Sequence, residues 1–186
     1  MSDDALTLAR QLLSFNTINP PGQEAECMAF LARWLQERGF EVTLSTFGAG
    51  RCNLLATLPG KGNGSPLAFT GHLDTVPLGD APWSHDPFGE VHNGRLYGRG
   101  ASDMKAAIAA FLVACVARAA FIRAGSGVVL ILTGGEETGC DGAQALLATG
   151  TLPEVGALIV GEPTFGKGTV QQYRSLNRIY DQMLRP

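Results

Sequence analysis

A histidine and an aspartate two residues apart, His72 and Asp74, follow a short apolar run that is typical of a buried strand. A histidine at a strand end can offer a neutral imidazole nitrogen to a metal ion. The aspartate can accept the N–H of the other ring nitrogen, which fixes the tautomer and makes the metal-binding nitrogen more basic. The same pair also fits a histidine that is hydrogen-bonded in a strand-end loop. It therefore indicates a metal site only if further ligands gather beside it.

Acidic residues mark the ends of three later elements: Asp103, then Glu136 with Glu137, and then Glu162. Singly they have simpler explanations, because Asp103 would suit a helix cap and adjacent acids are common in solvated loops. Four carboxylates in one site would repel one another, which raises the free energy of the folded chain. Bound divalent cations would neutralise this repulsion. Mixed nitrogen and oxygen ligands favour zinc, with cobalt or manganese as alternatives. If one of the paired glutamates faces the metal, its neighbour can serve as a general base.

The elements that would position these residues alternate between strands and helices. A first helix, capped by Asp3 or Asp4, is expected to run to about Phe15. Further helices are expected over 23–38, 102–118 and 141–148, and strands over 40–46, 53–58, 66–70, 128–132 and 157–160. The segments 60–65 and 92–95 each predict a hairpin turn. Unbroken apolar strands separated by helices indicate an α/β fold whose sheet is covered on both faces. In such sheets, sites form beyond the carboxyl ends of the strands, which is where the candidate ligands fall.

The composition excludes several classes of protein. A chain of 186 residues that is 45% hydrophobic and 17% charged predicts one globular domain. The net charge of −3 does not favour a nucleic-acid partner or an anionic membrane surface. The acidic first residues do not resemble a signal peptide, and no apolar run reaches the length of a membrane span. Four scattered cysteines without a C-x-x-C pair are typical of a reduced, cytoplasmic protein.

Five ordered motifs carry a resemblance to a known family. They lie at 71–77 (GHLDTVP), 86–88 (DPF), 96–105 (LYGRGASDMK), 135–137 (GEE) and 161–164 (GEPT). Over about residues 1–164 the chain resembles the catalytic domain of the M20 metallopeptidases, which include acetylornithine deacetylase and succinyl-diaminopimelate desuccinylase. The resemblance implies a three-layer, zinc-peptidase-like catalytic domain with a mostly parallel central sheet, here truncated.

The resemblance also implies a role for each candidate residue. Two zinc ions would be bound, with His72 and Glu162 on one, Glu137 on the other and Asp103 bridging both. Glu136 would be the general base, and Asp74 would orient His72. Metal-activated water would then cleave the amide bond of an N-acyl amino acid or a short peptide, so that a di- or carboxypeptidase is an alternative to a deacylase.

The chain departs from the family pattern in its length and in its set of metal ligands. Family members are longer and carry a lid and dimerisation domain, which is absent here, so no lid-mediated dimer is expected. The second metal lacks its histidine ligand, because His85 and His92 match no ligand position and are expected in loops or at the surface. An inactive truncated or fused remnant with partial metal binding is therefore a second reading of the chain.

The last segment, residues 165–186, does not resemble the M20 continuation. It is similar to part of the tail-specific, carboxy-terminal processing serine proteases, in which Lys167 would match the general-base lysine. We interpret this segment as a foreign tail joined at 161–164, where the patterns of the two families overlap. A more distant alternative is a serine acylase, because Ser102 and Lys105 fit its S-x-x-K signature.

Overall fold

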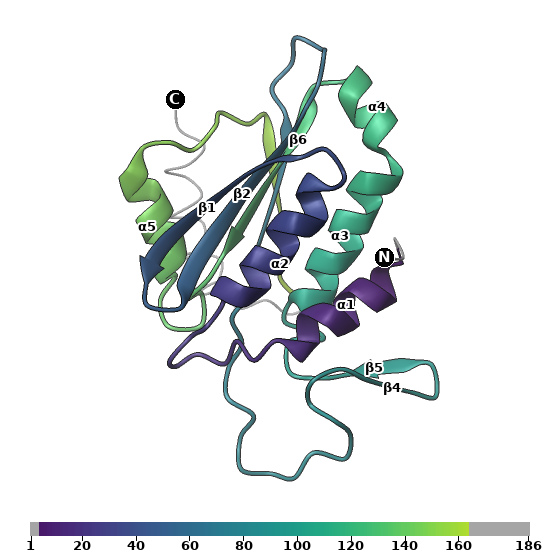
Figure 1. Cartoon of the computed structure of the whole chain (residues 1–186), viewed down its shortest axis with the longest axis vertical. Helices are drawn as coiled ribbons and strands as arrows, with labels where there is room; N and C mark the ends of the chain where they lie inside the picture. The colour runs from purple at the N-terminus through teal and green to yellow at the C-terminus, as the bar shows by residue number, and fades with distance from the viewer. Residues whose placement is uncertain (1–3, 164–186) are drawn as a thin grey trace.

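A five-stranded sheet forms the centre of the computed structural model, which describes residues 4–163 (Figure 1). Its strands lie in the order β1 (Glu41–Gly48), β2 (Arg51–Pro59), β6 (Gly127–Thr133), β3 (Leu67–His72) and β7 (Ala157–Val160). β3 is parallel to β6 and β7, and β2 is antiparallel to both of its neighbours. All strands except β2 therefore point the same way, which confirms the mostly parallel sheet. The tail of residues 165–186, with Lys167, lies outside the described residues.

Helices cover both faces of this sheet, as Figure 1 shows. On one side lie α1 (Ala5–Ser14), α2 (Ala25–Gln36), α3 (Lys105–Ala117) and α4 (Ala119–Ala124), and on the other lies α5 (Asp141–Thr149). Alternate residues of the buried strand β6 face the two sides, so Leu130 and Leu132 belong to the larger core and Val129 and Ile131 to the smaller. The three-layer α/β architecture is confirmed. Among the described residues, no helix is both long enough and apolar enough to cross a bilayer.

The helix expected over 102–118 begins later than predicted, at Lys105, and ends at Ala117 as α3. Turns occupy the chain up to Met104, where the Ala101 N–H donates to the Gly98 carbonyl and the Lys105 N–H to the Gly100 carbonyl. The backbone of Met104 lies at φ −138° and ψ 21°, outside the helical region, so the helix begins only after it. Asp103 consequently lies before α3 instead of capping it, and its carboxylate remains available to other groups.

The two predicted hairpins had opposite outcomes. Segment 60–65 does not join paired strands, because β6 lies between β2 and β3 and pairs with both. The buried, apolar β6 forms hydrogen bonds with β2 along one edge and with β3 along the other. This pairing between distant segments keeps β2 and β3 apart, although the sequence of 60–65 resembles a hairpin turn. The second prediction is confirmed: β4 (Glu90–His92) pairs with β5 (Arg95–Tyr97) across Asn93 and Gly94, whose φ angles of 49° and 71° suit a tight hairpin turn.

Helix α1 illustrates how the sequence specifies an element. The Asp4 carboxylate accepts the Thr7 N–H at 2.9 Å, so Asp4 is the one of the two predicted residues that caps the helix. One apolar face, which includes Leu8 and Leu12, is buried in the larger core. Leu6, on the same helix, is 44% exposed.

This contrast predicts unequal costs for the same substitution on one helix. Leu12 is 0% exposed, so Leu12→Ala should lower the free energy of unfolding by about 2–5 kcal/mol through lost burial and a residual cavity. Leu6→Ala is the matched control and should cost about 0.5 kcal/mol or less. Urea unfolding of the full chain measures both. Equal costs would contradict the burial of this face of α1 in the larger core.

Candidate metal centre

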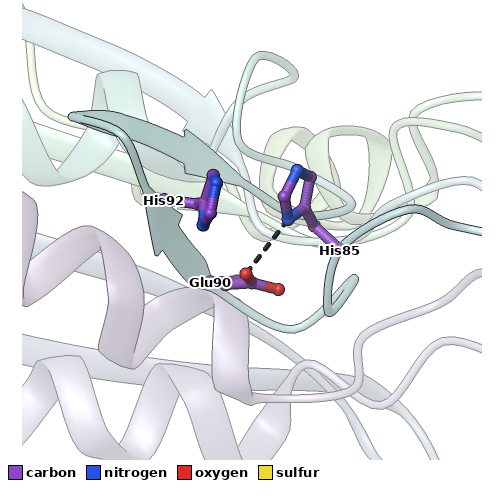
Figure 2. Close-up of side chains that lie close together, drawn as sticks. All are labelled: His85, Glu90 and His92. Carbon is purple, nitrogen blue, oxygen red and sulfur yellow. Dashed lines mark hydrogen bonds and ion pairs between the residues drawn. The ribbon is translucent and has the colours of Figure 1, made fainter.

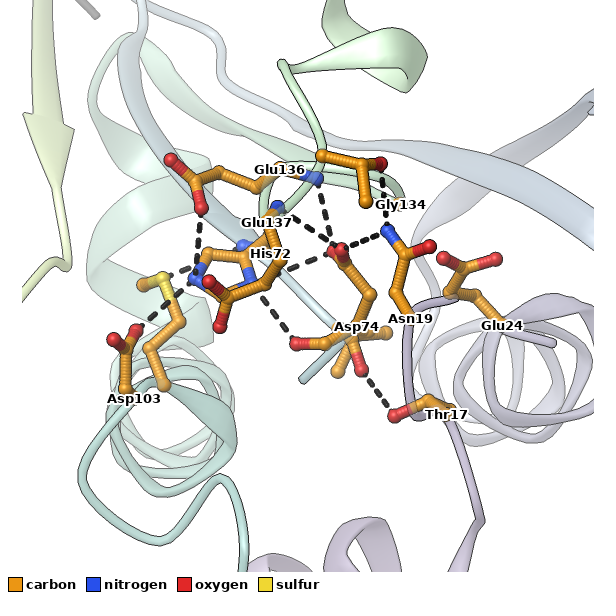
Figure 3. A network of polar contacts seen from close by, with 12 residues as sticks. Thr17, Asn19, Glu24, His72, Asp74, Asp103, Gly134, Glu136 and Glu137 are labelled. Carbon is orange, nitrogen blue, oxygen red and sulfur yellow. Dashed lines mark hydrogen bonds and ion pairs between the residues drawn. The ribbon is translucent and has the colours of Figure 1, made fainter. Parts of the chain in front are cut away.

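The His72 side chain is the centre of a polar cluster at the carboxyl end of β3 (Figure 3). The ring is 1% exposed, and its Nε2 atom lies 3.1 Å from Asp103 Oδ1 and 3.6 Å from Glu162 Oε1. Glu136 Oε2 lies 3.9 Å from the same nitrogen. Three carboxylates from distant parts of the chain thus surround one imidazole nitrogen.

Glu137 completes the candidate ligand set. Single ligand atoms of His72, Asp103 and Glu137 all lie within 4.8 Å of one another. These residues come from the end of β3, the turn before α3 and the loop after β6, while Glu162 follows β7. The structure therefore brings together all four residues that the sequence predicts as metal ligands, at the edge where parallel strands end.

Asp74 contacts His72, as expected, and also holds the loop that carries Glu136 and Glu137. Its backbone carbonyl, at 3.0 Å, is the closest acceptor for His72 Nδ1, and its carboxylate lies 3.4 Å from that nitrogen. The carboxylate also accepts the backbone N–H groups of Glu136 and Glu137, each at 3.1 Å. Asp74 thereby holds the histidine and the glutamate loop in one arrangement, with hydrogen bonds that the sequence pattern did not indicate.

Two residues of the segment after α1 support Asp74, and sequence reasoning missed both. Asn19 Nδ2 donates to the Asp74 carboxylate and to the Thr138 hydroxyl, each at 2.9 Å. Thr17 Oγ1 donates to the Leu73 carbonyl at 2.6 Å. Both side chains are buried. No local signal marks them, because polar residues near a Pro-Pro pair are ordinary loop residues.

The loop that carries the two glutamates is packed against a buried ion pair. Arg51 donates from Nε and Nη2 to the two carboxylate oxygens of Glu24, at 3.0 and 3.1 Å, and Glu24 is fully buried. A Cβ atom at Gly134 would lie only 2.8 Å from the Glu24 carboxyl carbon, so this position requires glycine. Asn53 Oδ1 accepts the Gly134 N–H at 3.1 Å and fixes the start of the loop.

The charges in the cluster perturb one another strongly. Burial raises the pKa of Glu136 to about 7, and the carboxylates of Glu162 and Glu137 act in the same direction. Burial by itself would lower the pKa of His72, but hydrogen bonds to neighbouring carboxylates hold it well above its usual value. Asp103 has a lowered pKa, mainly because of its hydrogen bond to His72. In the absence of a cation, a proton on His72 therefore offsets the crowded negative charge.

A divalent cation fits this donor set better than a proton does. One imidazole nitrogen and several carboxylate oxygens, converging from rigid element ends, match the ligand types that zinc, cobalt and manganese bind. Within residues 4–163, His72 is the single histidine of the cluster. His85 lies in the loop before β4 and His92 on β4, so the structure does not bring either into this group.

The alternative serine acylase site does not form. Lys105 is 1% exposed, and its Nζ donates to the carbonyls of Leu12 and Phe15, each at 2.9 Å. Burial lowers its pKa to about 8. Ser102 is exposed, while the lysine ammonium group secures the end of α1. The S-x-x-K match therefore reflects a packing role for the lysine.

The protonation of His72 predicts that zinc binding depends on pH. A histidine with a raised pKa carries a proton at neutral pH, and that proton must leave before the nitrogen can bind a metal. Zinc affinity should therefore rise as the pH is raised from 6 to 8, with proton release on binding. Calorimetry in buffers of different ionisation enthalpy measures this release. His72→Ala is the control and should lose both the proton release at this site and its zinc; a pH-independent affinity would contradict the assignment.

The contacts of Asn19 predict a second effect on zinc binding. Asn19→Ala removes a hydrogen bond to the Asp74 carboxylate, and loss of such outer partners weakens metal affinity by about 10–100-fold. Asn16→Ala, on the same loop but exposed, is the matched control and should leave the affinity unchanged. A competition titration against a zinc chelator compares the two variants. Equal affinities would show that Asn19 has no part in positioning Asp74.

Comparison with solved structures finds the same fold. An M20 family metallo-carboxypeptidase from Sulfolobus solfataricus matches with a TM-score of 0.73 at 22% identity, covering 86% of this chain and 37% of the other. Human carnosine dipeptidase 1 matches with a TM-score of 0.71 at 24% identity, covering 85% of this chain and 38% of the other. At these identities the likeness concerns the fold alone.

Comparison with curated sequences finds relatives of higher identity than these structures. A succinyl-diaminopimelate desuccinylase from Granulibacter bethesdensis is 43% identical over 168 residues, and one from Acidiphilium cryptum is 44% identical over 168 residues. Each alignment covers 87% of this chain but 42% of the relative, so the chain spans less than half the length of these relatives. The model of peptidase family M20/M25/M40 matches residues 68–173, more than half of the chain. The chain therefore belongs to the M20/M25/M40 peptidase family.

Proposed function

We propose that this chain carries part of the catalytic site of a zinc-dependent hydrolase that cleaves the amide bond of N-acyl amino acids. The observation that carries the proposal is the convergence of His72, Asp103 and Glu137 beside the buried carboxyl group of Glu136. The similarity to succinyl-diaminopimelate desuccinylases supports an acyl amino acid as the substrate. The products would be a carboxylate and a free amine.

In this proposal the metal ligands keep the roles that the family resemblance implies. His72 and Glu162 would hold one zinc ion, Glu137 a second, and Asp103 would bridge them, with cobalt or manganese as alternative ions. When bound, zinc polarises a carbonyl and makes a coordinated water more acidic. Asp74 would keep His72 and the glutamate loop in the orientation that this requires, through the contacts of its carbonyl and carboxylate groups.

Glu136 would move the proton. Its carboxylate would accept a proton from the attacking water and then donate it to the nitrogen of the leaving amine. A pKa of about 7 suits both steps, because a general base works best when its pKa lies near the working pH. The partly buried position of Glu136 maintains that value by penalising the charged form.

The proposal also specifies the acyl group that the enzyme would remove. A succinyl or acetyl group on a diamino acid is favoured by the named relatives, and a peptide bond presents the same amide to the site. A di- or carboxypeptidase activity therefore stays a candidate, as does a remnant that binds metal without turnover. The expected cytoplasmic location, the division at residue 164 and the absence of lid-mediated dimers stay predictions.

Substitution of Glu136 tests the proposal. Glu136→Gln removes the base while keeping the shape of the side chain, so the rate of hydrolysis of N-succinyl and N-acetyl amino acids should fall by about 10²–10⁴-fold. Bound zinc, measured by elemental analysis, should not change. Glu37→Gln, whose side chain is 64% exposed, is the matched control and should retain full activity.

Three results would count against the proposal. Full activity in Glu136→Gln would remove the glutamate from the chemistry. Loss of zinc in Glu136→Gln would make it a ligand instead of a base. Zinc binding without hydrolysis by the unmodified chain would favour the remnant.

A further inference from the structure

A second group of metal-binding side chains lies on the β4–β5 hairpin and the loop before it (Figure 2). Glu90 and His92 are two residues apart on β4, so their side chains share one face of the hairpin. His85 reaches this face from the preceding loop, and its Nδ1 lies 3.0 Å from Glu90 Oε1. None of these residues belongs to the cluster around His72.

The loop is fixed in a conformation that keeps the first two groups together. The second carboxylate oxygen of Glu90 accepts the Asp86 N–H at 2.8 Å, which closes the loop on itself. Arg10 Nε donates to the Gly89 carbonyl at 3.2 Å and ties the loop to α1. The His85–Glu90 contact is therefore supported by backbone hydrogen bonds as well as by its own.

Aromatic contacts fix the ring of His85. Its centroid lies 3.8 Å from that of Tyr97 and 5.0 Å from that of His92. Tyr97 stands opposite Glu90 in the ladder, so it belongs to the same face of the hairpin. This packing limits the rotation of the imidazole and leaves Nδ1 directed at the carboxylate.

The spacing of the ligand atoms suits a small tetrahedral ion. One ligand atom from each of His85, Glu90 and His92 lies within 4.8 Å of the other two. A zinc ion with bonds of about 2.1 Å holds its tetrahedral ligands about 3.4 Å apart. His85 Nδ1 and Glu90 Oε1, 3.0 Å apart, lie close to that spacing, and rotation of the exposed His92 side chain can bring its ring nitrogen nearer to both.

We propose that His85, Glu90 and His92 form a second zinc-binding site, separate from the metal centre around His72. Two imidazoles and one carboxylate select zinc or a similar transition-metal ion over magnesium or calcium, which prefer oxygen ligands. Three protein ligands leave the fourth position of the ion open to water. The sequence pattern alone predicts only loop or surface histidines here, because the family motifs assign neither of them.

The experiment uses the full chain with His72→Ala, which leaves His85 and His92 as the remaining imidazoles of the 186 residues. Zinc is titrated into this variant while the imidazole C–H signals are followed by NMR. We expect both signals to shift and to saturate at about one equivalent of zinc per chain. Magnesium is the control ion and should shift neither signal.

Two further substitutions in the His72→Ala background locate the site. His92→Ala should weaken zinc binding by at least about tenfold, and Glu90→Gln, which keeps an oxygen to accept the Asp86 N–H, should also weaken it. The far-UV circular dichroism of each variant verifies folding. Unshifted imidazole signals at several equivalents of zinc, or an affinity unaffected by both substitutions, would overturn the proposal.

Discussion

The buried carboxylate of Asp74 is the interaction on which the candidate metal centre depends. It accepts hydrogen bonds from Asn19 and from the backbone of Glu136 and Glu137, and it lies beside His72. Burial would raise its pKa, but the hydrogen bonds with His72 and Asn19 outweigh that effect and keep it below its usual value. An ionised group that is fully buried is tolerated only with such donors, so its four partners are held in place together.

The second constraint is the accumulation of negative charge around one imidazole. Glu136, Glu137 and Glu162 approach Asp103 at the end of the sheet, and such like charges would separate if they lay on flexible segments. Here the strand ends and the loop anchored by Glu24 and Arg51 prevent separation. This crowding of negative charge makes the site attractive to a divalent cation. Burial is the main cause of the raised pKa of Glu136, about 7, and the neighbouring carboxylates add to it.

Much of the fold could be predicted from hydrophobic pattern. The strand over 157–160 is observed with the same bounds, and the helices at both ends of the described chain differ by at most a residue or two. Errors occurred where local signals competed with distant pairing: the glycines of 60–65 resemble a hairpin turn, yet β6 separates the two strands. The end of α3 at Arg118 agrees with the predicted end of this helix, but the short helix α4 that follows it was not predicted.

The sequence by itself determined the chemistry available to the chain: which side chains can bind a metal, and that they stand at the ends of strands and helices. The order of residues along a chain carries this information directly, since motif and periodicity are local. Only the tertiary structure decided which distant groups support them. Asn19 donates a hydrogen bond to Asp74, and Glu24 forms an ion pair with Arg51 behind the glutamate loop. These contacts depend on packing between elements, which leaves no repeating pattern in the sequence.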